Sequence, residues 1–537
     1  MFTSFSCRAL GVALFCCLSS LAAVEASAQE PLMTPVPAPA PQVELWQQAQ
    51  EAADPSISRT SYGTLNVDAL AAVGAGTAPL PAVFQLSVFG EQRLVEFSAR
   101  DRCYRHVLLR GSVGRGEGDR VVLALGVDGD AAALVEVAGT RYELRSTGFG
   151  GVHALHQLDA AAPHGHSEFC GTGEDHAIHT PADGPQPLAS SAGATPVDVC
   201  IFYTPAVTGI AGGKGSIEAS LAMRLAVATQ SSEDSGVNQK YTLVHAAETN
   251  YTETGTGTDL SRFQNRSDGY MDEVHGLRNT YGGDLMALIT SFSSQFCGVA
   301  YLMTNPSTGF RDWAFSVNVL GCLGNDVLAH EMGHNMGCSH DRQNGGPGAY
   351  PYSYGYRSTN NAHRTIMAYS PGSRISMWSG PNVVYSGFTM GTANDDNVRS
   401  LNNVSPVVSN FTPKVVFDWE LMGGGALGWL FGPIISFTGA KNHLIPIRVR
   451  IDRPRPGAPG VIIIGNTTSN IPLFGATLIP NVVVTVPVTG SNEGVLLNLP
   501  QLAALPSGTD TYYQGFFVDS YAPSGLSATA GMRVTVP

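Results

Sequence analysis

The feature that most constrains this chain is a run of three histidines around one glutamate and one glycine. His330-Glu331-x-x-His334 places two imidazoles one helical turn apart on the same helix face. Gly337 can adopt the left-handed backbone that ends a helix, so the chain can reverse there and bring His340 to the same point. Three imidazoles in this arrangement are a ligand set for one Zn²⁺. The motif therefore predicts a metal centre on a helix spanning residues 325–336.

Three protein ligands leave a fourth zinc position for water, which is typical of a catalytic rather than a structural site. Glu331 lies between the two helical histidines, where its carboxylate can take a proton from that water and pass it to a leaving amine. We predict hydrolysis of peptide bonds, with Glu331 as general base. The alternative, a helix with merely surface histidines, requires every motif position to match by chance.

The motif and its surroundings resemble those of the metzincin metalloendopeptidases, most closely the reprolysin (adamalysin) type and its secreted bacterial relatives. Asp341, directly after the third histidine, is typical of that branch. Thr365-Ile366-Met367-Ala368-Tyr369 is similar to the methionine turn of these enzymes. The resemblance covers about residues 197–412. It implies that Met367 forms an apolar floor beneath the histidines.

The same resemblance suggests how a substrate lies in the site. It implies that an extended peptide pairs with an edge strand over residues 298–303. It places a side-chain pocket after Tyr369, built from Arg374, Ile375, Met377 and Trp378. Tyr369 has two interpretations, because the astacin and serralysin branches use such a tyrosine as a zinc or oxyanion contact. The other interpretation is a packed aromatic side chain.

The N-terminus indicates export. Residues 1–8 carry one basic residue, residues 9–24 are apolar, and Ala26-Ser27-Ala28 offers small residues for cleavage before Gln29. This pattern predicts a signal peptide over 1–28 and a secreted or extracellular protein, with cell-surface association left open. Residues 421–440 are also uncharged, but six glycines and Pro433 favour entry into a β domain over a membrane span.

Six of the nine cysteines follow the predicted signal peptide, and an even number in an exported chain suggests disulfides. Cys297 opens the predicted edge strand and Cys322 ends the next strand, so we expect them to be bridged. Cys200 and Cys338 are then left to pair.

Cys170 lies in Phe169-Cys170-Gly171, which resembles the cysteine switch of latent metzincins, where a thiolate fills the open zinc position. The alternative is a disulfide between Cys103 and Cys170. Latency also requires a zymogen whose mature form starts between residues 180 and 197. The histidines between 164 and 179 are read as part of a solvated linker.

The fold class predicted is multidomain: a β-rich propeptide, an α/β metzincin catalytic domain and a small all-β C-terminal domain. The catalytic sheet is expected to be mixed, mostly parallel and five-stranded, because strands alternate with helices there. The expected helices span 216–230 with Ser216 as N-cap, 260–281, 325–336 and 395–411. The domain limits are a signal peptide at 1–28, a propeptide at 29–195 with a linker-like end from 159, a catalytic domain at 196–412 and an accessory domain at 413–537.

The net charge of the chain limits the kinds of partner that it can bind. Acidic residues outnumber basic ones by 43 to 30, a net charge of −13, which argues against nucleic acid and anionic membranes. Protein or peptide substrates bound in extended form are expected, and the ligand of the C-terminal domain is unknown. The run 394–397 (Asn-Asp-Asp-Asn) either holds Ca²⁺ or caps a helix.

One other function stays open. The alternative is an adhesive or ligand-binding secreted protein, whose metzincin domain serves processing or is an inactive scaffold. The intact Glu331 and the three histidines argue against the scaffold.

Overall fold

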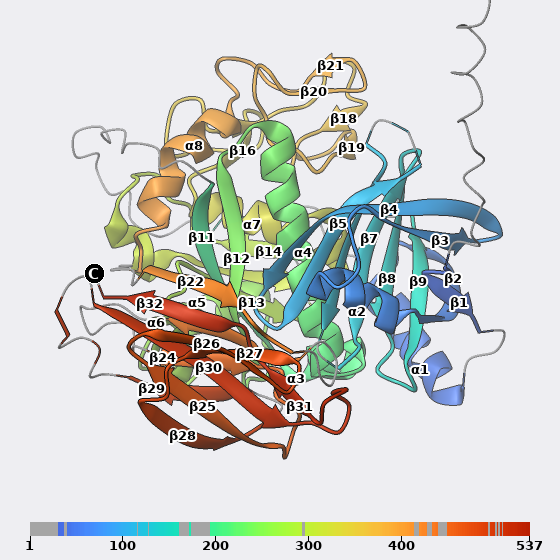
Figure 1. The fold of residues 1–537 in the computed structure, drawn as a ribbon. Coiled ribbons are helices and arrows are strands. Elements are labelled where there is room, and N and C mark those ends of the chain that lie inside the picture. The colour runs from blue at the N-terminus through green and yellow to red at the C-terminus, as the bar shows by residue number, and fades with distance from the viewer. Residues whose placement is uncertain are drawn as a thin grey trace, which may run out of the picture.

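A computed structural model describes most of the chain from residue 30 to residue 536. The residues outside the description are 1–29, 37–39, 115, 117, 127, 160–170, 173–193, 293–295, 413–417, 427–431, 439–447, 492–493, 500–501, 503–504, 507–508 and 537. The predicted signal peptide, Cys170 and the histidines at 164–179 therefore lie outside the described residues. Three units follow one another along the chain (Figure 1).

The N-terminal β unit, residues 30–158, is one antiparallel sheet of nine strands in the order β1-β2-β9-β8-β7-β6-β5-β4-β3. Alternate residues along its central strands face opposite sides. One face carries Leu109, Leu123 and Ala133 into the unit's own core, and the other carries Leu108 and Leu134 toward the next unit. Its elements are β1 (Met33–Pro35), α1 (Pro41–Ala53), β2 (Ile57–Leu65), α2 (Val67–Ala75), β3 (Ala82–Val88), β4 (Glu91–Cys103), β5 (His106–Val113), β6 (Arg120–Gly126), β7 (Ala131–Val137), β8 (Thr140–Ser146) and β9 (Val152–Leu158).

The central unit, residues 194–412, holds a mixed sheet, and its five strands have the order β14-β15-β13-β11-β12. Four of them are parallel and β14 alone is antiparallel to its neighbour, so the expected mixed, mostly parallel sheet is confirmed. A sixth strand, β10 (Gly171–Thr172), comes from upstream and pairs in parallel with β14. The five strands are β11 (Thr195–Tyr203), β12 (Gln239–Glu248), β13 (Leu285–Thr290), β14 (Gly298–Ala300) and β15 (Phe315–Val319).

The helices of the central unit depart from expectation in two places. The first long helix starts at Lys214 after Gly213, while the Ser216 hydroxyl donates to Asp130 of the N-terminal β unit instead of capping the helix. The single helix expected over 260–281 is two helices. Between them, Asn265 and Asp268 side chains accept hydrogen bonds from nearby backbone N–H groups, which competes with helix formation. The helices are α3 (Pro205–Ala211), α4 (Lys214–Ser235), α5 (Thr256–Gln264), α6 (Glu273–Tyr281), η1 (Thr308–Trp313), η2 (Leu320–Asn325), α7 (Val327–Asn335) and α8 (Asn397–Val408).

After α7 the chain forms short two-residue and three-residue strands rather than a further layer. They are β16 (Ser339–Asp341), β17 (Tyr354–Gly355), β18 (His363–Arg364), β19 (Ser373–Arg374), β20 (Val384–Tyr385) and β21 (Phe388–Thr389). Figure 1 shows β18 to β21 above α7, on the side of the molecule opposite the C-terminal strands.

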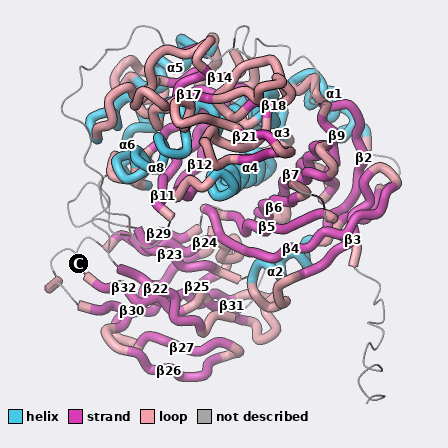
Figure 2. The backbone as a smooth tube through the Cα atoms, turned by 90° about the horizontal axis from the view of Figure 1, so that it is seen from above, coloured by secondary structure: helices cyan, strands magenta, loops and turns pink. Residues whose placement is uncertain are grey.

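The C-terminal β unit, residues 418–536, is all β, as Figure 2 shows. A six-stranded sheet, a three-stranded sheet and one hairpin enclose a separate core that includes Ile451, Ile462 and Phe517. No described helix is both long and apolar enough to cross a membrane. The strands are β22 (Asp418–Gly423), β23 (Ile434–Thr438), β24 (Arg448–Asp452), β25 (Pro459–Gly465), β26 (Thr468–Leu473), β27 (Ala476–Pro480), β28 (Val484–Thr489), β29 (Val495–Asn498), β30 (Asp510–Val518), β31 (Leu526–Ala528) and β32 (Gly531–Thr535).

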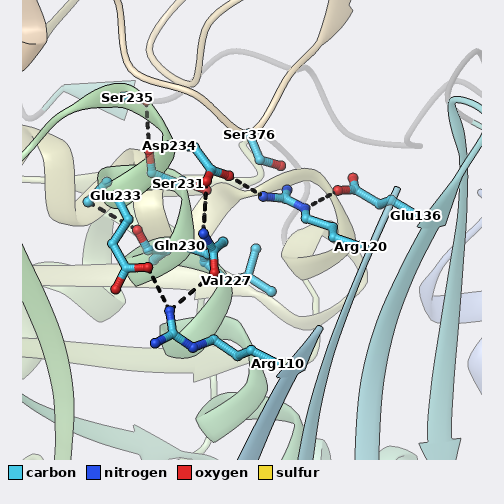
Figure 3. Close-up of polar contacts among 12 residues, drawn as sticks. Arg110, Arg120, Glu136, Val227, Gln230, Ser231, Glu233, Asp234, Ser235 and Ser376 are labelled. Carbon is cyan, nitrogen blue, oxygen red and sulfur yellow. Dashed lines mark hydrogen bonds and ion pairs between the residues drawn. The ribbon is translucent and has the colours of Figure 1, made fainter. Parts of the chain in front are cut away.

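The N-terminal β unit docks on α4 through charge as well as apolar packing (Figure 3). Arg110 donates to Glu233 at 2.7 Å, and Arg120 reaches Asp234 at 3.1 Å. Deeper in the interface, Glu143 is fully buried between Arg224 of α4, at 2.5 Å, and Arg145 of its own sheet, at 2.8 Å. These two arginines hold the pKa of Glu143 at about 2, against the effect of its burial, which raises it.

Candidate metal centre

Three buried histidines converge at the end of α7. His330 and His334 lie on that helix, and His340 lies on β16 after the chain reverses at Gly337, which has φ +80°. The His340 Nε2 atom is 3.0 Å from His334 Nε2 and 3.2 Å from His330 Nε2. The structure thus brings together the three histidines that the sequence singles out.

The outer nitrogen of each α7 histidine bonds to the backbone. His330 Nδ1 is 2.8 Å from the Ile366 carbonyl, and His334 Nδ1 is 2.8 Å from the Cys338 carbonyl. A carbonyl accepts only, so both Nδ1 atoms carry the proton and both Nε2 lone pairs point inward. Burial lowers the pKa of all three histidines, that of His340 to about 4, so they stay neutral at ordinary pH.

This cluster fits a metal ion. The inward lone pairs on the Nε2 atoms of His330 and His334 are placed to bind one cation together with His340. Nitrogens bound tetrahedrally to zinc at ~2.0–2.1 Å lie about 3.3 Å apart, close to the 3.0 and 3.2 Å separations here. Among the described residues, these three histidines are the group whose donor atoms could hold a metal.

Glu331 is fully buried and lies between α7 and the edge strand β14. A methyl group placed on Gly298 of that strand would stand 2.8 Å from Glu331 Cδ, nearer than real Cβ atoms approach. Gly298 is therefore required for this close approach of strand and carboxylate. Sequence reasoning did not single out Gly298, and its position at the start of the strand after Cys297 gave no signal of this role.

Met367 lies beneath the histidine helix. A Cβ on Gly333, the glycine between the two α7 histidines, would stand 2.7 Å from the Met367 sulfur and about 3.1 Å from the Trp378 ring. Trp378 is fully buried, and its ring nitrogen donates to Ser232 at 3.3 Å. The expectation that Trp378 lines a side-chain pocket is therefore wrong: it supports α7 from within the core.

Asp341 fixes the loop that carries Tyr369. Its Oδ2 accepts a bond from the Tyr369 N–H at 3.1 Å, and its Oδ1 pairs with Arg357 at 2.6 Å. The Tyr369 ring is buried, with its centroid 4.2 Å from that of His340. The ring therefore packs against the histidine cluster. From the sequence, Asp341 was expected only as a residue typical of the reprolysin branch. Its bonds to the Tyr369 N–H and to Arg357 were not predicted.

The cysteines follow the expectation in part. A disulfide joins Cys297 to Cys322 across 25 residues. Cys200 and Cys338 are free and buried, so the expected pairing of these two is wrong: each lies in its own apolar layer of the core, where burial raises the thiol pKa. Cys103 is also free, and its sulfur accepts a bond from the Leu243 N–H at 3.2 Å, so the alternative Cys103–Cys170 disulfide is not formed.

The acidic run before α8 has a structural role. Asp396 is the N-cap of α8 and accepts a bond from the Arg399 N–H at 2.9 Å, while Asp395 pairs with Arg342 at 2.6 Å. Both carboxylates thus stabilise the start of this helix, which is the capping alternative given above for the run.

A cleft of about 860 Å³ lies between the N-terminal β unit and the segment after Tyr369. Arg374, Ile375 and Met377 line one wall, and arginines of the N-terminal β unit line the opposite wall. Arg141 crosses from that unit, donating to the Gly324 carbonyl at 2.6 Å and to Ser376 at 2.7 Å. The N-terminal β unit therefore covers this side of the site.

Comparison with known proteins agrees with this geometry. Residues 194–379 match the metallo-peptidase family M12 (Reprolysin_5). The chain is 29% identical over 429 residues to the peptidyl-Asp metalloendopeptidase of Xanthomonas campestris pv. campestris, covering 75% of this chain and 98% of that one. It is 32% identical over 234 residues to the enzyme of the same name from Stenotrophomonas maltophilia strain K279a, covering 42% of this chain and 55% of that one.

A solved structure, metalloproteinase-II from Bacteroides fragilis, covers 50% of this chain and 85% of its own at 14% identity. Its TM-score of 0.33 is too low to support an inference about fold. The histidine cluster on a mixed α/β sheet, together with the matches in sequence, defines a metzincin-like metalloendopeptidase.

Proposed function

We propose that the protein is a secreted, zinc-dependent endopeptidase made as a zymogen, with His330, His334 and His340 as metal ligands. The observation that carries the proposal is the convergence of three buried Nε2 atoms, with those of His334 and His330 lying 3.0 and 3.2 Å from that of His340. Zinc bound there would act as a Lewis acid toward water and the peptide carbonyl.

Glu331 is the proposed general base. Its carboxylate lies between the histidine helix and β14, the strand along which an extended peptide would pair. From that position it takes a proton from the attacking water and delivers it to the leaving nitrogen. Asp341 holds the backbone of Tyr369 so that the ring stays against His340, and a contact between the Tyr369 hydroxyl and the oxyanion belongs to this proposal.

Glu331→Gln tests the assignment. Glutamine keeps the shape but cannot accept the proton, so casein hydrolysis should fall by about 100-fold or more while bound zinc is unchanged. Glu248→Gln, a matched change at the half-buried end of β12, should keep wild-type turnover. Near-normal hydrolysis by Glu331→Gln would contradict the assignment.

The relatives' name extends the proposal to substrate. Both enzymes compared above are called peptidyl-Asp metalloendopeptidase, and we propose that this chain also cleaves bonds next to aspartyl residues. A peptide library digested by the mature enzyme and read by mass spectrometry tests this directly. Cleavage without enrichment of Asp beside the cut would refute it.

Latency rests on the strand β10. Gly171 pairs with Val299 and Thr172 with Ala300 on the edge strand, in the parallel sense. The upstream segment thus takes the place that a substrate strand would use, and Cys170, the residue before β10, is proposed to cap the metal. Residues 29–195 are the proposed propeptide, 196–412 the catalytic domain and 413–537 the accessory domain.

Cys170→Ala tests the cap. If the thiolate fills the open metal position, the intact precursor should gain part of the activity without being cut, because the metal position opens while β10 still occupies the edge strand. Cys200→Ala is the matched control, a buried cysteine in β11 away from the cleft, and should leave the precursor latent. An equally latent Cys170→Ala precursor would remove the thiolate from the proposal.

A further inference from the structure

A site that selects an aspartyl residue needs a cation beside the scissile bond. Five arginines line the 860 Å³ cleft: Arg110, Arg120, Arg141, Arg364 and Arg374. The first three belong to the N-terminal β unit and would leave with a propeptide. The question is therefore which of the remaining two can meet a substrate carboxylate.

Arg364 is committed to the loop that carries it. It is buried, and its Nε and Nη1 donate to the carbonyls of Gly372 and Ala368 at 2.8 and 2.9 Å. These bonds close the turn between β18 and β19. If Arg364 bonded to a substrate instead, the loop would lose these two hydrogen bonds and would not keep its conformation.

Arg374 differs in place and exposure. It is half-buried on β19, in the wall of the cleft, and its Nη1 donates to the Asn325 carbonyl at 2.8 Å. Asn325 directly precedes Asp326, the N-cap of α7, whose carbonyl accepts the His330 N–H bond at 3.0 Å. The guanidinium is thus held at the start of the histidine helix, one turn before His330.

The chemistry of the guanidinium suits a substrate carboxylate. A guanidinium offers five N–H donors, and two of them can bind a carboxylate side by side. The bond to the Asn325 carbonyl fixes the orientation of the planar group.

We propose that Arg374 is the residue that recognises the aspartyl side chain of the substrate. This inference rests on the proposed cleavage next to Asp. The carboxylate of a residue beside the scissile bond would lie in the cleft and bind the Arg374 head. In the precursor, Arg141 bonds to Ser376, two residues from Arg374, so the N-terminal β unit covers the recognition residue until it leaves.

The test compares peptides that differ at one position. Mature wild-type enzyme and the variants Arg374→Gln and Arg374→Lys are assayed on four peptides that carry Asp, Asn, Glu or Ala beside the cleaved bond. Arg399→Gln, on the exposed side of α8, is the matched control. The measured quantity is the ratio of kcat/KM for the Asp peptide to that for the Asn peptide, so a general loss of activity in a variant cancels.

We expect Arg374→Gln to lower this ratio about 10- to 100-fold, the usual worth of hydrogen bonds to a charged group. Arg374→Lys, which keeps the charge but loses the planar fork, should give an intermediate ratio, and Arg399→Gln the wild-type ratio. Wild-type ratios in both Arg374 variants would overturn the inference and leave the proposed function intact. A wild-type enzyme that does not prefer Asp would overturn the proposed specificity itself.

Discussion

The two β units are attached to the central unit in different ways. The N-terminal β unit shares a core with it: Leu108 and Leu134 pack in the same apolar cluster as Leu221 and Met332. The C-terminal β unit encloses its own core. The first unit therefore completes the fold of the central unit, whereas the second folds around itself.

The charged contacts of the two β units also differ. Glu143 of the N-terminal β unit is buried against Arg224 of α4. In the C-terminal β unit, Arg453 donates to the Arg105 carbonyl at 3.2 Å, and Arg450 lies 5.5 Å from the centre of the Tyr104 ring. Both residues reach the turn between β4 and β5 of the N-terminal β unit. Because the central unit and the C-terminal β unit both contact the N-terminal β unit, removing that unit changes the surroundings of both.

The largest expected effect follows from separating the N-terminal β unit. Cutting between residues 173 and 193 leaves β10 joined to that unit, and the shared core holds the unit in place. We therefore expect activity to rise only when the cut unit dissociates, by about 100-fold or more, because the docked unit keeps β10 on the edge strand after the tether is cut just as it does before, when the tether adds a millimolar effective concentration. Peptide hydrolysis before and after size-exclusion separation measures this.

Full activity immediately after the cut, with the unit still bound, would show that β10 does not block the site. A precursor as active as the separated enzyme would remove the latency proposal altogether.

The next effect concerns the buried charge at the interface. Glu143→Gln leaves the buried Arg224 without its carboxylate, while Arg145 keeps Asp54, and should destabilise the precursor by about 3–5 kcal/mol. Glu420→Gln, which removes the exposed partner of Arg533 in the C-terminal β unit, should change the free energy of unfolding by less than about 1 kcal/mol. Both substitutions are made in the inactive Glu331→Gln protein, and urea unfolding measures the change in the free energy of unfolding that each one causes. Equal effects of the two changes would contradict the comparison.

A smaller effect, on the free energy of unfolding, is expected when the pH is lowered. His106 is buried beneath the turn between β4 and β5, and burial, then the charges of Arg453 and Arg105, lower its pKa to about 3. The unfolded chain takes up a proton near pH 6.5 and the folded one does not, so stability is present above pH 6.5 and falls as the pH drops toward 3. At pH 5 the loss is about 2 kcal/mol.

His106→Gln should remove that part of the acid sensitivity. Thermal unfolding at pH 7 and pH 5, compared between the Glu331→Gln precursor and its His106→Gln derivative, measures the difference. The same pH dependence in both would show that His106 is not the group responsible.

The metal centre could be predicted from sequence because its parts are local. His330, His334, Gly337 and His340 lie within eleven residues, and helix periodicity with one left-handed glycine brings them together. The mostly parallel pairing of strands in the central sheet followed from their alternation with helices. Contacts between segments that lie far apart in the sequence have no such local pattern, so they could not be predicted.

Three particulars show where sequence reasoning failed. Gly298 matters because Glu331 approaches it from another element, and Trp378 is buried because α7 covers it. Cys200 and Cys338 were paired by counting, but three-dimensional distance decides disulfides and it places them in different layers of the core. Such contacts depend on tertiary structure and have no local pattern.

The smallest effect is expected from deleting the C-terminal β unit. Its core includes Ile451, Ile462 and Phe517, and the central core ends at Phe411, so a chain that stops after residue 412 keeps every apolar contact of the histidine helix. Separated from its N-terminal β unit, such an enzyme should hydrolyse small peptides within about 3-fold of the full-length rate, since it keeps the groups that contact the reacting bond. Peptide assays with equal amounts of zinc-loaded enzyme measure this. A large loss on small peptides would show that the C-terminal β unit supports the site, whereas a loss confined to large protein substrates would assign it a role in binding them.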